Sequence, residues 1–180
     1  MSQEVAIVTE GEFDAKILEK LLQGKRVKSE YKILPANGYS SALSKVKSLL
    51  TLKNKKVVLL LDTDTISKNE IREKEEFVNS YINATLNKTS FKTFWAVPEL
   101  EVIFLDNKEF IKELPKSTFN DEIIKNKEFI NVARVAPKKI LENLFNFNRE
   151  KLISLLDKPE IREEFYKEGL IKEIVDYIEK

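Results

Sequence analysis

The sequence predicts an α/β fold, in which an open, mainly parallel sheet of about four strands is flanked by helices and followed by a helical C-terminal extension. Short segments rich in apolar and β-branched residues alternate with segments in which apolar residues recur at helical spacing. Such alternation implies right-handed crossovers between parallel strands. Residues 57–61 are apolar at every position, which is typical of a central strand covered on both faces.

The individual elements follow from these patterns in chain order. Strands are expected at residues 4–9, 31–34, 57–61 and 91–97. Helices are expected over the apolar repeats at residues 13–22, 42–50 and 68–86. Beyond residue 105 we expect a short strand at 129–133 and helices at 137–146, 149–156, 159–168 and 169–179. The chain is therefore divided into an α/β domain at residues 1–114 and a helical extension at 115–180 that packs on it.

The amino-acid composition limits the kinds of catalytic and metal-binding site that the protein can contain. The 180 residues include no cysteine and no histidine, which excludes thiol nucleophiles, disulfides, histidine bases and the usual zinc sites. Catalysis must then use carboxylates, lysines, hydroxyls or oxygen-bound metals, and Mg²⁺ or Mn²⁺ prefer carboxylate oxygens. The sequence shows neither an apolar run of membrane-spanning length nor a signal peptide. A cytoplasmic protein is expected.

Acidic residues follow three of the expected strands. Glu10 follows the first strand, Asp62 and Asp64 follow the third, and Glu99 and Glu101 follow the fourth. The carboxyl ends of parallel strands meet at one edge of the sheet, so we expect these side chains to lie close together. Gathered carboxylates repel one another unless a cation lies between them. The sequence therefore predicts a divalent metal site at this edge.

The spacing of the acids supports this interpretation. Glu10 and Asp14 are four residues apart, so both face the same side of a helix that begins near Gly11. Asp62 and Asp64 are two residues apart and share a face if the segment is extended. Each pair also has a structural explanation, because acidic residues commonly cap helices. Their joint occurrence after the expected strands favours the metal site.

The ordered motifs Glu10-Gly11-x-x-Asp14 and Asp62-x-Asp64 resemble the Toprim domain of topoisomerases, primases and nucleases of the OLD type (overcoming lysogenization defect). The resemblance spans roughly residues 4–105, is closest to the OLD-type nucleases, and implies a Toprim or Rossmann-like sheet in a catalytic domain. It also implies that Glu10 acts as a general acid/base or metal ligand. Asp62 and Asp64 would bind Mg²⁺, and Asp14 matches a further metal ligand of the OLD-type enzymes.

The OLD-type comparison extends to two later segments. Residues 97–101 resemble a segment that carries a glutamate ligand, with Glu101 the preferred ligand and Glu99 the second choice. A later lysine of those enzymes corresponds to Lys138 or Lys139, which would stabilise charge that develops on phosphate. The resemblance thus implies hydrolysis of a phosphodiester with Mg²⁺ or Mn²⁺, in a site that holds two ions.

The expected substrate is DNA or RNA. Residues 16–56 carry eleven Lys or Arg against two acidic residues, a stretch that either faces phosphates or forms a solvated helix surface. OLD-type enzymes carry an ATPase in the same chain, whereas no P-loop motif occurs here. A separate ATPase or another protein partner is therefore expected, in a phage-defence or toxin system. The sequence does not fix the oligomeric state.

Three alternatives stay open. A Toprim-like module could bind nucleic acid or a partner protein without cutting it. A haloacid-dehalogenase-like phosphatase would use residues 62–65, but Ile66 stands where its DxDxT motif requires a hydroxyl residue. A receiver domain would use Asp62 as phospho-acceptor with Lys138, yet only Glu10 and Glu12 stand where receivers carry paired acids. A topoisomerase or primase is disfavoured by the short chain and the missing zinc ligands.

Overall fold

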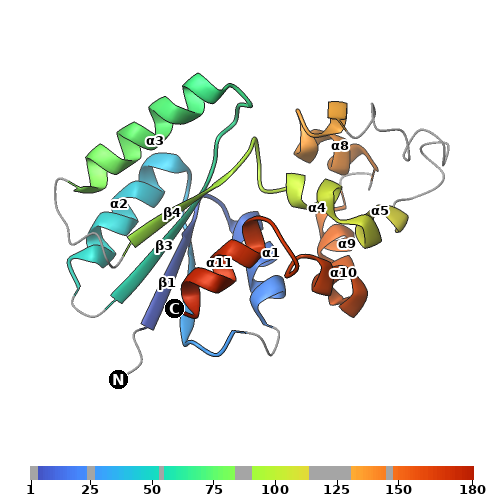
Figure 1. Cartoon of the computed structure of the whole chain (residues 1–180), viewed down its shortest axis with the longest axis horizontal. Coiled ribbons are helices and arrows are strands. Elements are labelled where there is room, and N and C mark those ends of the chain that lie inside the picture. Colours follow the sequence, from blue (N-terminus) through green and yellow to red (C-terminus); the bar gives the residue numbers. More distant parts are fainter. Residues whose placement is uncertain (1–3, 24–26, 53–54, 84–90, 114–130, 145–147) are drawn as a thin grey trace.

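The computed structural model describes residues 4–23, 27–52, 55–83, 91–113, 131–144 and 148–180. Four parallel strands form one sheet in the order β2-β1-β3-β4 (Figure 1). The strands are β1 (Glu4–Thr9), β2 (Tyr31–Pro35), β3 (Lys55–Asp62) and β4 (Phe91–Ala96). The predicted α/β fold is confirmed, and β3 is an inner strand between β1 and β4, as its unbroken apolar run predicted.

Helices cover both faces of the sheet. Figure 1 shows α2 (Tyr39–Leu50) and α3 (Lys68–Asn83) on one face and α1 (Glu12–Leu22) with α11 (Leu170–Ile178) on the other. Successive side chains of β3 alternate between the two faces. Val58 and Leu60 belong to the apolar cluster that includes α1 and α11, whereas Val57, Leu59 and Leu61 belong to the cluster of α2 and α3.

The remaining helices gather beyond the carboxyl ends of the strands (Figure 1). They are α4 (Val102–Asp106), α5 (Lys108–Lys112), α8 (Pro137–Leu144), α9 (Arg149–Ser154) and α10 (Pro159–Glu164), with a 3-10 turn at Leu155–Asp157. The Phe104 side chain is fully buried among them, and its ring centroid lies 4.8 Å from that of Phe110 and 5.9 Å from that of Phe165. Aromatic packing therefore joins α4 and α5 to the end of α10.

The last helix, α11, runs back along the sheet. Its Tyr177 ring meets the Phe94 ring of β4 edge-on, with centroids 5.9 Å apart. Beyond the helix, the Glu179 carboxylate accepts hydrogen bonds from the backbone N–H groups of Lys28 and Ser29, each at 2.9 Å. The C-terminal helix is thus attached both to β4 and to the segment that leads into β2.

The structure differs from the sequence expectation in the extension. Residues 131–133 are helical rather than part of a strand, and Val132 is 68% exposed, so its apolar character did not indicate a buried strand. Residues 129–130 and the expected domain boundary at 114–115 lie outside the described residues. One apolar cluster contains residues from both expected units. In the described part of the chain, no helix combines the length and the apolar character of a membrane span.

Candidate metal centre

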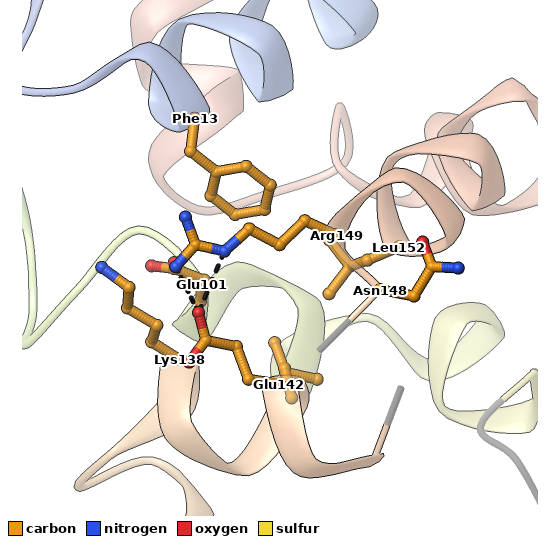
Figure 2. A pocket seen from close by; sticks show the side chains of 8 residues that line it. Phe13, Glu101, Lys138, Glu142, Asn148, Arg149 and Leu152 are labelled. Atoms are coloured by element: carbon orange, nitrogen blue, oxygen red, sulfur yellow. Dashed lines mark hydrogen bonds and ion pairs between the residues drawn. The ribbon is translucent and has the colours of Figure 1, made fainter. Parts of the chain in front are cut away.

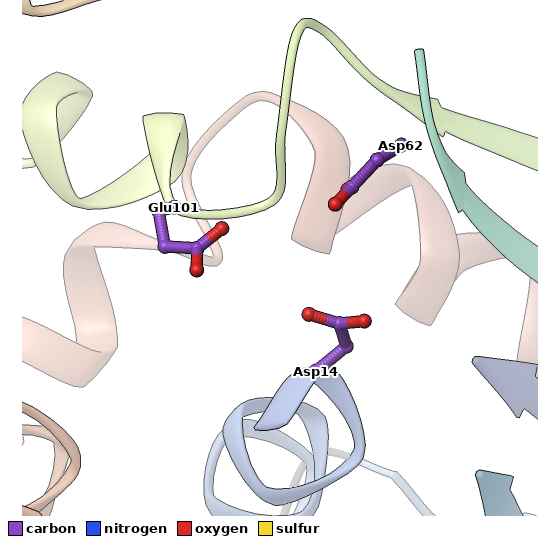
Figure 3. Close-up of side chains that lie close together, drawn as sticks. All are labelled: Asp14, Asp62 and Glu101. Atoms are coloured by element: carbon purple, nitrogen blue, oxygen red, sulfur yellow. The ribbon is translucent and has the colours of Figure 1, made fainter. Parts of the chain in front are cut away.

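Three carboxylates converge at the carboxyl edge of the sheet. Asp14 lies in the first turn of α1, Asp62 is the last residue of β3, and Glu101 directly precedes α4. Each offers an oxygen atom within 4.8 Å of the other two. Figure 3 shows the three side chains pointing toward one another from these elements. Three acidic residues thus lie close enough to bind a metal ion, as the positions after parallel strands predicted.

Backbone hydrogen bonds hold two of these carboxylates in place. Asp62 Oδ1 accepts a hydrogen bond of 2.9 Å from the backbone N–H of Leu100, and Asp14 Oδ2 accepts one of 3.1 Å from Gly11. The bond to Gly11 is the short-range contact expected of an acid in the first turn of a helix. Both carboxylates are therefore oriented by the backbone before any ion arrives.

The three acids are difficult to ionise in the absence of a cation. Burial, together with the charges of Asp14 and Glu101, raises the pKa of Asp62 to about 8. Burial also raises the pKa of Glu101 to about 7 and that of Asp14 above its ordinary value. A divalent ion among them would offset both the lost hydration and the mutual repulsion. The donor set therefore fits a hard, oxygen-bound metal.

Glu10 lies beside this group. It is not among the carboxylates that approach one another within 4.8 Å in the described residues. Burial, followed by the charges of Asp64 and Asp14, raises the pKa of Glu10. Its Oε2 atom is buried and has no hydrogen-bond partner in the described part of the chain. Such an oxygen is available to a metal ion, a water molecule or a substrate.

Asp64 does not share a face with Asp62, contrary to the sequence expectation. The backbone at Asp64 is left-handed, with φ 53°, which ends the extended alternation that the expectation assumed. Its side chain is 67% exposed and forms an ion pair of 3.1 Å with Lys74. It also lies outside the converging group of three carboxylates. The role of Asp64 as a metal ligand stays a prediction.

Of the two predicted lysines, Lys138 is the one near the carboxylates. It is the second residue of α8 and lines a small pocket together with Glu101 (Figure 2). Its charge acts to lower the pKa of both Asp14 and Glu101, against the larger effect of burial. Lys139 is exposed to solvent.

Glu99 has a different structural role from Glu101. Its carboxylate accepts a hydrogen bond of 3.2 Å from the backbone N–H of Lys138, at the N-terminus of α8, a position that favours acidic groups. Glu99 thus joins α8 to the end of β4 and does not belong to the converging group, whereas Glu101 does, as predicted.

The pocket also contains residues that sequence reasoning missed. Figure 2 shows the Arg149 side chain reaching over Phe13, and its guanidinium carbon lies 4.9 Å from the ring centroid. Arg149 Nε donates a hydrogen bond of 2.9 Å to Glu142 Oε1. The positive charge of Arg149 also acts to lower the pKa of Asp14. No sequence signal pointed to Arg149, because only the fold brings α9 next to α1.

Part of the basic stretch at residues 16–56 lies away from the site. Lys32, Lys55 and Lys56 stand at or near the amino ends of β2 and β3, at the opposite edge of the sheet from the carboxylates. Lys55 pairs with Glu4 at 2.9 Å. These lysines therefore do not provide a basic surface beside the candidate metal site. A count of charges along the sequence does not reveal at which end of a strand each charged residue lies.

Comparisons with known proteins add no relative: no family model, no curated protein and no solved structure matches this chain. The resemblance to Toprim domains therefore rests on the motif residues alone.

Proposed function

We propose that the protein is a phosphodiesterase that depends on Mg²⁺ or Mn²⁺ and acts as a nuclease on DNA or RNA. The observation that carries the proposal is the convergence of Asp14, Asp62 and Glu101 within 4.8 Å at the carboxyl edge of the sheet. Their partly or fully buried, mutually repelling carboxylates are the kind of ligand set that oxygen-bound divalent ions require. Toprim-like motifs at two of these positions support the same class of chemistry.

The neighbouring residues supply complementary roles. A divalent ion held by the three carboxylates would activate a water molecule and stabilise charge on a phosphate. The raised pKa and the buried, unpartnered oxygen of Glu10 suit it to accept a proton from that water. Lys138 lies on the side of Glu101 and would neutralise a phosphate oxygen. A separate ATPase or other protein partner, in a phage-defence or toxin system, remains part of this proposal.

Metal binding is the first test. Titration of the wild-type protein with Mn²⁺ is expected to show binding, and Glu101→Gln is expected to weaken it by roughly tenfold or more, because one of three charged ligands becomes neutral. Glu109→Gln is the matched control, since Glu109 lies on the surface and pairs with Lys112. A wild-type protein that binds neither Mn²⁺ nor Mg²⁺ would refute the proposed enzyme.

Cleavage is the second test. Labelled DNA and RNA are each incubated with the protein in Mn²⁺ or Mg²⁺, and the wild type is expected to cut at least one of them. Glu10→Gln is expected to retain Mn²⁺ binding but to lose about a hundredfold or more in cleavage rate, the usual loss when a general base is removed. Equal cleavage by this variant and the wild type would contradict the role given to Glu10. Metal binding without cleavage of either polymer would favour the non-catalytic module.

A further inference from the structure

The Toprim resemblance implies two metal ions with Asp64 among their ligands, and the surroundings of Asp64 do not fit the second ion. We infer that the ammonium group of Lys74 stands in for that second ion, so that the site binds a single divalent ion. The inference rests on the proposed function, because it presupposes that Asp14, Asp62 and Glu101 hold a metal.

Lys74 reaches the site from the second turn of α3. Its Nζ atom donates a hydrogen bond of 2.5 Å to the backbone carbonyl of Thr63 and one of 3.1 Å to Asp64 Oδ2. The Lys74 side chain is 33% exposed and so partly shielded from solvent, whereas that of Asp64 is 67% exposed. An ammonium group bonded to both a carbonyl and a carboxylate occupies the oxygen ligands that a magnesium ion would need.

The loop that carries Asp64 is fixed by its own bonds. The backbone N–H of Asp64 donates to the carbonyl of Pro98 at 2.8 Å, and the Thr63 hydroxyl, on a fully buried side chain, donates to the carbonyl of Thr65 at 2.7 Å. With the left-handed backbone at Asp64, these bonds hold the carboxylate where it contacts Lys74 of α3. A second ion shared by the two aspartates would require this loop to rearrange.

Electrostatics favours the same arrangement. Lys74 forms an ion pair with Asp64, and its charge also acts to lower the pKa of Glu10, against the larger effects of burial and of the neighbouring acids. A positive charge beside these two carboxylates therefore already opposes part of their repulsion. A divalent ion placed beside Asp64 would be repelled by the ammonium group or would have to displace it.

The number of bound ions tests the inference. Mn²⁺ stoichiometry is measured by titration on the full chain, with electron paramagnetic resonance reporting the free ion. The wild type is expected to bind one ion and Lys74→Met two. Without the ammonium group, Asp64, Glu70 and Glu73 line an open cleft that can accept a cation. Arg72→Met is the matched control, because Arg72 is an exposed cation on the same helix, and it is expected to bind one ion.

The outcomes separate the two proposals. Two ions on the wild-type protein would overturn the inference and leave the proposed metal enzyme intact. A single ion on Lys74→Met would also overturn it, because the lysine would then not be what excludes the second ion. No ion on the wild type would refute the proposed function, and the inference with it. Circular dichroism of each variant verifies that the chain is folded.

Discussion

Replacing Asp62 with asparagine is expected to stabilise the metal-free protein at pH 8.5 while weakening its response to metal. Burial raises the pKa of Asp62 from 3.8 to about 8. The native state therefore binds a proton more tightly than the unfolded chain, and stability is lost as pH rises from about 4 through about 8. At roughly 1.4 kcal/mol per pH unit, the ionised carboxylate costs on the order of 5 kcal/mol above this window. Asparagine avoids that cost and can still accept the Leu100 hydrogen bond.

Urea unfolding in EDTA at pH 5 and pH 8.5 measures this difference. The wild type is expected to lose stability between the two pH values, and Asp62→Asn to lose less. Mn²⁺ at about a hundred times its dissociation constant should stabilise the wild type by roughly 3 kcal/mol and the variant much less. Asp157→Asn is the control, because Asp157 is exposed and pairs with Lys20. An Asp62→Asn protein less stable than the wild type in EDTA at pH 8.5 would contradict the assignment.

Truncating Phe104 to alanine is expected to lower the free energy of unfolding by about 3–5 kcal/mol. Phe104 is fully buried and packs against Phe110 and Phe165, so its removal leaves a cavity where α4, α5 and α10 meet. Because α4 begins directly after Glu101, the same change should also weaken Mn²⁺ binding.

Chemical denaturation followed by tryptophan fluorescence and circular dichroism measures the loss, and Mn²⁺ titration measures the second effect. Phe77→Ala is the matched control, since Phe77 is 54% exposed on α3, and it is expected to cost less than about 1 kcal/mol. A loss of less than about 1 kcal/mol for Phe104→Ala would show that α4, α5 and α10 do not depend on this aromatic contact.

Local sequence patterns were sufficient to predict the strands of the sheet and part of the candidate metal site. The apolar run of β3 fixed the place of Asp62, and helical spacing fixed that of Asp14, because each depends on a few neighbouring residues. Glu101 was expected at this edge because it follows the fourth strand, but its preference over Glu99 came only from the OLD-type comparison. The order of the strands was not visible, since it depends on pairing between segments far apart in the chain.

Other features depend on contacts that no local pattern encodes. The left-handed backbone at Asp64 brings its carboxylate to Lys74, ten residues later on α3, so the spacing of the Asp62-x-Asp64 motif did not by itself predict how the two side chains lie. Arg149 comes beside Phe13 through the packing of the extension. The exposed Val132 shows that an apolar residue in a short run does not by itself make a buried strand.

The position of α11 determines when one face of the sheet becomes covered during synthesis of the chain. All four strands leave the ribosome before residues 170–178, yet this last helix covers one face of the sheet beside β4. Phe94 of β4 stays open to water, and to other nascent chains, until α11 emerges. An uncovered apolar face is prone to aggregation. The sheet around Phe94 is thus covered on both faces only after residues 170–178 have been synthesised.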